Sequence, residues 1–322
     1  MTAASSARLG AGVLGTAFVL LWCTGYPAAK IALSHAGPFV LLTLRFGGAA
    51  LIYGALALWA RAPWPRGRQA LHSVAIGTLQ LALQFGGVYL AAARGVNVGL
   101  IALVIGTMPI LTALIGLMFG ERVWPLQWLG FVFGFGGVAL AVGESIRPGA
   151  SAGGIAYLAM ILGLIGIASG TLYQKRCGSQ TDLRSGLAVQ HAVAALLLLP
   201  GAALEGWRWD GSAPAFLSLA WLIVVNSLGG FALFYLLLKR GAVNQVATLF
   251  FLMPPVTAVL DYLVLGDPLS GYQLAGIALA AFGVFLATRP HDAGGAPEGQ
   301  RAASGSSPLR PSARRMKKRR NS

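Results

Sequence analysis

The chain has 322 residues, of which 56% are hydrophobic and only 10% are charged. A water-soluble domain carries about 25% charged residues, so this composition excludes a soluble globule and favours an all-α protein buried in a lipid bilayer. The net charge of +15 does not indicate a nucleic-acid partner, because much of it lies in one C-terminal tail. The two cysteines and four histidines show no spacing typical of metal ligands, so no metal, no cofactor and no enzymatic activity are expected.

Ten apolar stretches are each long enough to cross a membrane, which takes about 20 residues. A cytoplasmic segment, 1–9, precedes the first stretch, which we interpret as a retained helix rather than a removed signal peptide. The first half of the chain has predicted spans at 10–30, 38–60, 70–92, 96–119 and 125–143. The second half has predicted spans at 152–174, 185–204, 213–238, 242–265 and 269–288.

The second half repeats the first at an offset of 146 residues, without a gap. Matching pairs include Phe85 with Phe231, Arg94 with Arg240, Pro109 with Pro255, and Gly130 with Gly276. An odd number of spans in each repeat makes the second copy enter the membrane from the opposite side. The sequence therefore predicts ten transmembrane helices built from two inverted five-helix repeats, 10–143 and 152–289, an arrangement typical of carriers.

The basic residues predict the orientation of these repeats. With the N-terminus inside, the inner segments before the tail hold ten Lys and Arg and the outer joints hold four. Both termini are therefore predicted to be cytoplasmic. The tail, 290–322, is rich in Gly, Ser, Ala and Pro and is predicted to be disordered. We expect its basic residues to contact anionic lipid, with RNA binding as the alternative.

Four motifs stand out, the last two at corresponding places in the two halves: the segment WCTGYPAAK at 22–30, Pro38 followed by Arg45, Met108-Pro109-Ile110 with Gly120-Glu121, and Leu252 to Val256 with Gly266-Asp267. Together they resemble the motifs of the EamA-type transporters of the drug/metabolite transporter superfamily. Two positions depart from the family pattern: Asp267 stands where glutamate is usual and Cys23 where glycine is common. The resemblance covers about residues 10–289. It implies a multi-pass carrier of the bacterial inner membrane that exports small metabolites, such as amino acids, or drugs.

A charged side chain inside a membrane is expected to have a partner or a function, because burying it there costs several kcal/mol unless it is paired or hydrated. Arg45 is predicted either to pair with a carboxylate or anionic substrate group, or to bind backbone carbonyls. Its repeat counterpart, His191, either couples transport to protons or is a neutral core histidine. Asp261 either serves in ion coupling or in an ion pair with Arg45 or a loop cation, or is a hydrated or structural acid near a helix end. Lys30 ends the first predicted span, as a gate or as a side chain that reaches the interface.

Uncharged polar and aromatic side chains complete the candidate substrate site. Gln80 and Gln84 lie one helical turn apart, and Asn226 is the repeat counterpart of Gln80. They either line a cavity with Tyr89, or join helices by hydrogen bonds. Trp22 and Tyr26 are candidates for the same cavity, with packing as the alternative.

Other residues are given structural or hinge roles. Pro109 and the pair Pro254 and Pro255 fall in the middle of predicted spans at corresponding places, as hinge or cavity residues. Tyr173 and Tyr235 are interpreted as interface anchors. Glu121 is expected to pair locally, for example with Arg122.

These features favour a secondary transporter whose two repeats alternately open a central polar site to either face. The partners expected are the bilayer, a small-molecule substrate and protons. No Walker-type phosphate loop occurs, so direct use of ATP is not expected. The alternatives are a membrane-embedded enzyme and a channel or scaffold protein.

Overall fold

The computed structural model describes residues 3–96, 101, 104–143, 153–178, 181–240, 249–265 and 270–288. Contacts divide the chain into two compact units, Met1–Arg289 and Pro290–Ser322, and the described residues all belong to the first. The predicted tail lies outside the described residues.

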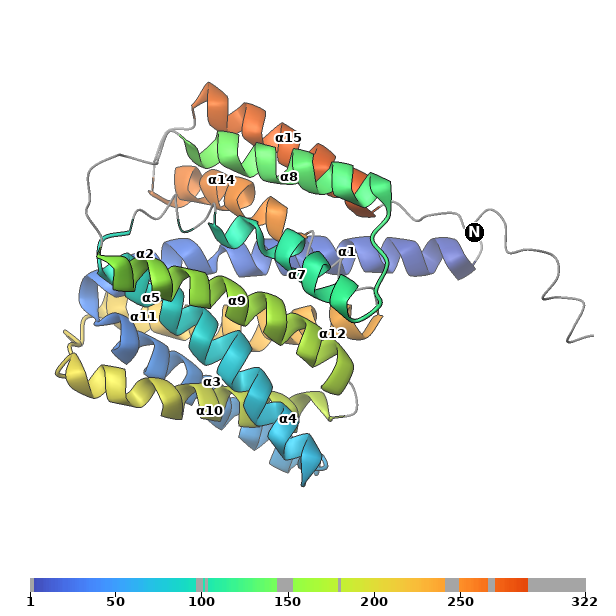
Figure 1. Cartoon of the computed structure of the whole chain (residues 1–322). Helices are drawn as coiled ribbons and strands as arrows, with labels where there is room; N and C mark the ends of the chain where they lie inside the picture. Colours follow the sequence, from blue (N-terminus) through green and yellow to red (C-terminus); the bar gives the residue numbers. More distant parts are fainter. Residues whose placement is uncertain are drawn as a thin grey trace, which may run out of the picture. The chain divides into compact units, whose positions relative to one another are not determined.

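The described part of the chain is helical (Figure 1). In the first half the elements are α1 (Ala3–Cys23), α2 (Gly25–His35), α3 (Pro38–Trp59), α4 (Arg68–Ile76), the π-helix η1 (Gly77–Leu83), α5 (Gln84–Ala93), α7 (Met108–Met118) and α8 (Pro125–Gly143). In the second half they are α9 (Gly154–Cys177), α10 (Leu183–Leu204), α11 (Ala213–Trp221), the π-helix η2 (Leu222–Gly230), α12 (Phe231–Arg240), the 3-10 helix η3 (Leu249–Leu252), α14 (Met253–Leu265) and α15 (Gly271–Thr288).

Six helical stretches in the described residues are long and apolar enough to span a membrane. They run over Val13–His35, Pro38–Trp59, Arg68–Ala93, Gly154–Cys177, Leu183–Leu204 and Ala213–Lys239. Three shorter apolar helices cover Met108–Met118, Pro125–Leu140 and Gly271–Ala287. The predicted number of ten transmembrane helices remains a prediction.

The repeat seen in the sequence is also present in the backbone. Shifted by 146 residues, α3 falls on 184–205 and α8 falls on 271–289, each within one residue of the observed α10 and α15. The π-helix η1 falls on 223–229, inside η2. The contacts are reciprocal as well: η1 packs against α9 and α10, while η2 packs against α1, α2 and α3. Reciprocal contacts of this kind are what a two-fold relation between two units produces.

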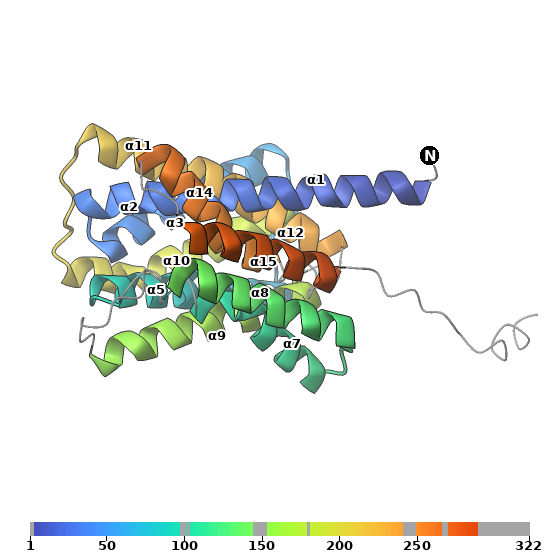
Figure 2. The same ribbon diagram turned by 90° about the horizontal axis from the view of Figure 1, so that it is seen from above.

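Helices α8 and α15 pack together through glycines (Figures 1 and 2). A Cβ atom added to Gly130 would lie 2.7 Å from the Gly283 carbonyl oxygen, and one added to Gly137 would lie 2.7 Å from that of Gly276. A residue later in α8 therefore contacts a residue earlier in α15, so the two helices run antiparallel. Small residues permit this close approach, which in a membrane supplies the packing energy.

Helices α3 and α10 are also repeat counterparts in contact. A Cβ atom on Gly201 would lie 2.7 Å from the Phe39 ring, whereas one on Gly47 would lie 4.0 Å from Ala195. These contacts again run in opposite directions along the two helices. Two pairs of counterpart helices are thus antiparallel.

The first predicted span is wrong in its boundaries. The candidate span runs over Val13–His35 rather than ending at residue 30, and its helix, which begins at Ala3, is interrupted at Thr24. Lys30 therefore lies inside α2, five positions before its end, and is exposed rather than ending the span. The interruption follows from Pro27, which lacks an N–H for the helix ladder.

Pro109 and Pro255, two of the prolines predicted to lie in the middle of spans, stand in the first turns of helices, and their hinge or cavity role stays a prediction. Pro109 stands in the first turn of α7 and is buried. Pro255 is buried in the first turn of α14, where a 3-10 turn precedes the α-helix. The missing N–H of proline costs nothing at such a position, because the first N–H groups of a helix have no intrahelical partner. The side chain of Pro254 lies outside the described part.

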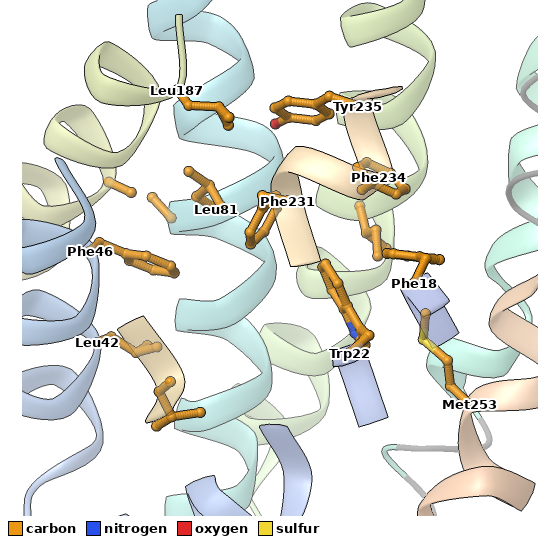
Figure 3. Packing of buried hydrophobic residues seen from close by; sticks show 14 of the residues in the cluster. Phe18, Trp22, Leu42, Phe46, Leu81, Leu187, Phe231, Phe234, Tyr235 and Met253 are labelled. Carbon is orange, nitrogen blue, oxygen red and sulfur yellow. The ribbon is translucent and has the colours of Figure 1, made fainter. Parts of the chain in front are cut away.

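The aromatic core lies around Trp22 (Figure 3). The Trp22 ring lies 5.0 Å from the Phe231 ring and 5.4 Å from the Phe18 ring, centroid to centroid. Phe234 and Phe250 complete its surroundings. This core joins α1, α12 and η3, and it stands beside the buried polar groups described next.

Two loops each contact and stabilise a junction between two helices. The loop after α10 contacts the junction of α2 and α3, where Trp209 forms an isolated antiparallel bridge with Ala36. The Glu205 carboxylate accepts hydrogen bonds from the backbone N–H groups of Phe39 (3.0 Å) and Val40 (3.3 Å), in the first turn of α3. The carboxylate thus satisfies donors that the helix itself leaves unpaired.

The same loop carries a polar cluster of His35, Asp210 and Ser212. The Asp210 carboxylate contacts His35 Nδ1 and accepts a 2.9 Å hydrogen bond from the Ser212 backbone N–H. The Ser212 bond, followed by the His35 bond, lowers the pKa of Asp210 below its ordinary value.

The counterpart junction, between α9 and α10, is fastened in a corresponding way. Ser185 Oγ donates a 2.7 Å hydrogen bond to the Pro63 carbonyl. Pro63 is the repeat counterpart of Trp209, and Ser185 is that of Phe39. Asp182 caps the start of α10 by accepting from the Arg184 N–H, and its hydrogen bond to the Arg184 side chain is the main cause that lowers the pKa of Asp182.

Candidate functional site

Polar side chains are buried between the apolar helices of the described part. Those that matter for the site are Arg45, Gln80, Gln84, Thr171, Gln174, Gln190, His191, Asn226 and Ser227. Tyr235 is buried among them, with only 1% of its surface exposed. They form two neighbouring groups, which we call the glutamine network and the arginine cluster.

The glutamine network consists of Gln80, Thr171, Gln174, Gln190 and Tyr235. Gln80 Nε2 donates to Thr171 Oγ1 (3.1 Å), and Gln190 Nε2 donates to Gln174 Oε1 (3.1 Å). The Tyr235 hydroxyl lies 2.8 Å from Oε1 of Gln80 and 2.8 Å from Oε1 of Gln190. The network therefore joins η1, α9, α10 and α12, which belong to both repeats.

The Tyr235 hydroxyl carries one proton but faces two amide oxygens. It donates to one of them, so the other glutamine must turn its –NH2 toward the phenol for the network to be satisfied. Reversing one amide reverses the direction of its neighbours' hydrogen bonds. The network thus has two polarities of similar geometry in the space between four helical elements.

The arginine cluster consists of Arg45 and the side chains around its buried guanidinium, which are Ser227, Tyr89, Phe46, Phe85 and His191. Arg45 Nε donates to Ser227 Oγ at 2.9 Å, and the Tyr89 hydroxyl lies near the guanidinium. Its carbon Cζ lies 4.9 Å from the centre of the Phe85 ring and 5.5 Å from that of Phe46. The cation thus lies among two neutral hydroxyls and two aromatic faces.

His191 is fully buried beside Arg45. Its Nδ1 bonds the Leu187 carbonyl at 2.9 Å, and its ring packs against those of Phe46, Tyr53 and Phe231. Because a carbonyl only accepts, Nδ1 carries a proton. The other nitrogen, Nε2, has no hydrogen-bond partner among the described residues.

Asn226 does not join its repeat counterpart Gln80. Its Nδ2 donates to the carbonyls of Leu21 (2.7 Å) and Trp22 (3.2 Å), just before the break between α1 and α2. Gly25 is required there, because a Cβ atom would lie 2.7 Å from Asn226 Nδ2. Asn226 therefore stabilises the interrupted helix rather than standing with Gln80.

The remaining candidates divide between packing and the site. Trp22 packs in the aromatic core, whereas Tyr26, four residues on, is 40% exposed and interacts with Tyr89. Gln84 is buried at the start of α5, and its Oε1 lacks a partner among the described residues. Of these candidates, Tyr89 is the one that lies near Arg45.

Asp261 stands in α14, but its side chain lies outside the described part, so its predicted pairing with Arg45 stays a prediction. Glu121 was expected to pair with Arg122. It bonds Lys175 at 3.0 Å and lies 3.6 Å from Arg176 instead. The end of α7 is thereby joined to the end of α9, because the chain reverses at Gly120, which has a positive φ of 80°.

Sequence reasoning missed most of the glutamine network. Thr171, Gln174 and Gln190 were not singled out, and Tyr235 is a buried network member rather than an interface anchor. The available signal was an amide in an otherwise apolar span, since Gln174 and Gln190 both lie in spans of high hydropathy.

The comparisons with known proteins agree with this architecture. A sequence profile described as the EamA-like transporter family matches residues 10–143 and 154–289, once for each repeat. The chain belongs to the EamA-like transporter family. It is a membrane transporter, and the resemblance noted in its sequence motifs is confirmed.

Curated relatives of this EamA-like transporter come from bacteria and plants. An uncharacterized inner membrane transporter of Escherichia coli (strain K12), YedA, is 27% identical over 272 residues, which cover 84% of this chain and 86% of YedA. The transporter YvbV of Bacillus subtilis (strain 168) is 27% identical over 279 residues, covering 83% and 88%. A WAT1-related chloroplastic protein of Arabidopsis thaliana is 24% identical and covers 84% and 67%.

A solved crystal structure shares the fold of this EamA-like transporter. It superimposes with a TM-score of 0.71 at 22% identity, over 87% of this chain and 98% of the other. The likeness concerns the fold alone.

Proposed function

We propose that this EamA-like transporter is a secondary carrier that works by alternating access between two inverted repeats. The observation that supports it most is the antiparallel packing of counterpart helices, α8 with α15 and α3 with α10. Counterpart helices that point in opposite directions make the two faces of a membrane protein nearly equivalent. A site between them then opens to either side by the same motion.

The proposal includes ten spans with both termini in the cytoplasm of a bacterial cell, at the inner membrane. The bias of Lys and Arg toward one set of loops supports this orientation, and YedA is named as an inner membrane protein. In this orientation the basic tail, 290–322, contacts anionic lipid.

The transported compounds are proposed to be small metabolites or drugs, carried outward. The glutamine network and the arginine cluster support a central polar site, because they join elements of both repeats in an apolar surrounding. Conformational preference shifts only as far as a ligand's affinity differs between the two states. A site bonded to both repeats is placed to create such a difference. His191, buried in the cluster, is the candidate for coupling to protons.

The test begins with a resistance screen. Cells that overproduce the protein are challenged with amino acids, their analogues and drugs. Each compound to which these cells show raised tolerance is then radiolabelled, and its transport is measured in proteoliposomes. A carrier is expected to give a saturable flux of the labelled compound, and this flux should be faster when unlabelled compound is present on the opposite side of the membrane.

Two other results would contradict the proposal. Flux that rises linearly with concentration, without counterflow, would indicate a channel. A compound recovered in chemically altered form, with no flux of the parent, would indicate a membrane-embedded enzyme. A reporter fused to the C-terminus is expected to be active only in the cytoplasm, and a periplasmic signal would remove the proposed topology.

A further inference from the structure

We propose that the arginine cluster binds a carboxylate group, so that the compounds carried are small organic anions or zwitterions. This inference rests on the proposed carrier function and assigns a substrate chemistry to Arg45, Tyr89 and Ser227. Its basis is a buried cation for which the described residues supply no counter-ion.

The charge of Arg45 is uncompensated in the described part of the chain. Arg45 is 4% exposed, and its guanidinium contacts the Ser227 hydroxyl and the faces of Phe46 and Phe85, with the Tyr89 hydroxyl nearby. Hydroxyls and rings stabilise a cation only in part. A charge at membrane depth that lacks a partner is costly, and an anion that arrives with the substrate removes that cost.

A second observation points to a missing polar partner at the same place. The His191 ring and the Arg45 guanidinium both lie against the Phe46 ring, and Nε2 of the fully buried His191 has no hydrogen-bond partner among the described residues. Buried polar atoms are nearly always paired, so an unpaired one indicates a ligand or a water in the working protein. The charged or titratable groups that face His191 are Arg45 and Tyr53, both from α3.

The charge of the cluster selects among anions. A neutral His191 leaves one positive charge, on Arg45, which one carboxylate cancels. A phosphate dianion would leave an excess negative charge among Phe46, Phe85 and Phe231, whose ring faces are themselves electron-rich. The guanidinium fork also fits a planar carboxylate with two parallel hydrogen bonds.

Asp261 is the competing counter-ion. It belongs to α14, which packs mainly against α1, α15, η3 and α2, whereas α3 packs mainly against α10, η2 and α5 and only slightly against α2. The two helices thus have different sets of main neighbours, which favours a counter-ion brought by the substrate.

The test measures binding of sodium acetate, the smallest stable carboxylate probe, to the purified full chain in nanodiscs. The readout is the 15N resonance of the His191 ring, assigned by its loss in His191→Gln. A saturable shift is expected with acetate, and none with acetamide, which has the same shape without the charge, nor with sodium phosphate or sodium chloride at equal ionic strength. Arg45→Gln is expected to weaken acetate binding by about tenfold or more, because a hydrogen bond to a charged group contributes at least that factor.

Control variants keep the result interpretable. Arg45→Lys retains the charge and is expected to retain weakened binding, and Arg94→Gln, which removes a cation from a helix end, is expected to leave it unchanged. The proposal is overturned if wild-type protein shows no saturable acetate shift, if acetamide gives the same shift, or if Asp261→Asn creates a shift that the wild type lacks. A carrier that moves only uncharged compounds would also overturn it, while leaving the carrier function intact.

Discussion

Phe85 and Phe231 are repeat counterparts that touch each other, with ring centroids 6.2 Å apart and planes inclined by 55°. Arg45 stands over the Phe85 ring, and His191, its counterpart, packs edge-on against the Phe231 ring at 5.3 Å. The two repeats thus contact each other through this pair of rings, and one polar side chain packs on each ring. A cation is held on one side and an imidazole on the other, so the meeting point is symmetric in shape and asymmetric in charge.

The Tyr235 hydroxyl is expected to stabilise the meeting of the repeats. Tyr235→Phe removes the hydroxyl that bonds Gln80 and Gln190, so one amide oxygen loses its donor in a buried place. We expect a loss of about 1–2 kcal/mol in the free energy of unfolding, measured by denaturant unfolding in detergent. Tyr272→Phe, at a residue with 61% of its surface exposed, is the matched control and should have no measurable effect. Equal stability of the two variants would mean that the network contributes nothing.

The glycines of α8 are expected to differ according to what they face. Gly137→Ala places a methyl group 2.7 Å from the Gly276 carbonyl oxygen of α15, so the helices must separate, at a cost of about 1–3 kcal/mol. Gly136→Ala, one residue earlier, meets nothing closer than Leu279 at 3.8 Å. It should be neutral or stabilising, because alanine favours the helix by up to about 1 kcal/mol. Thermal unfolding of the pair checks this, and a reversed order would contradict the antiparallel contact.

The Asp210 carboxylate is expected to make stability depend on pH. Its pKa is lowered in the folded protein by the Ser212 and His35 bonds. A carboxyl with a depressed folded pKa contributes stability above its unfolded pKa, about 3.9, and loses it as the pH falls through the folded value. Asp210→Asn should therefore lower the melting temperature at pH 7, and the difference from the wild type should shrink below about pH 4. A difference that stays constant down to pH 3 would show that the charge is not the cause.

The two loop junctions are expected to lie on opposite sides of the membrane. Arg66 belongs to the loop that contains Pro63, and Arg208 to the loop that contains Trp209. In a background with Cys23 and Cys177 replaced by alanine, Arg66→Cys should react with an impermeant maleimide only in inside-out vesicles. Arg208→Cys should react only in intact spheroplasts. Labelling of both from one side would exclude an inverted repeat.

Gln80 is expected to matter for transport more than for insertion. Gln80→Ala breaks the bonds to Thr171 and Tyr235 and should slow efflux of the screened compound by about fivefold to tenfold, the equivalent of one hydrogen bond. Gln127→Ala removes an amide that caps the start of α8 through the Trp124 N–H, and it should leave efflux unchanged. Membrane content is measured by immunoblot for both. Wild-type efflux in Gln80→Ala would place the site elsewhere.

Much of the fold follows from hydropathy, because a span is a property of one segment. The prediction of 38–60 agrees with Pro38–Trp59, and that of 125–143 agrees with Pro125–Gly143. The first span was less predictable: Pro27 interrupts its helix, but the backbone carbonyls before the break are bonded by Asn226, which comes from the other repeat. Span boundaries that depend on distant side chains are not encoded locally.

The site was predicted less well than the fold. Arg45 and Gln80 were identified because polar groups are rare in apolar helices, and Tyr235 was misjudged because it lies near the end of its span. The bond between Tyr235 and Gln190 joins residues 45 positions apart in the chain, and helical spacing reports only neighbours on one helix. The widening of η1 has no signature in its sequence, GTLQLAL.

The two π-helices bear on how the repeat arose. A widened turn of this kind holds more residues than the regular helix it replaces, yet η1 and η2 coincide at the same offset as the elements around them, with no gap. The simplest history is that the extra residue was already present in a half-length ancestor, before its gene was copied and fused.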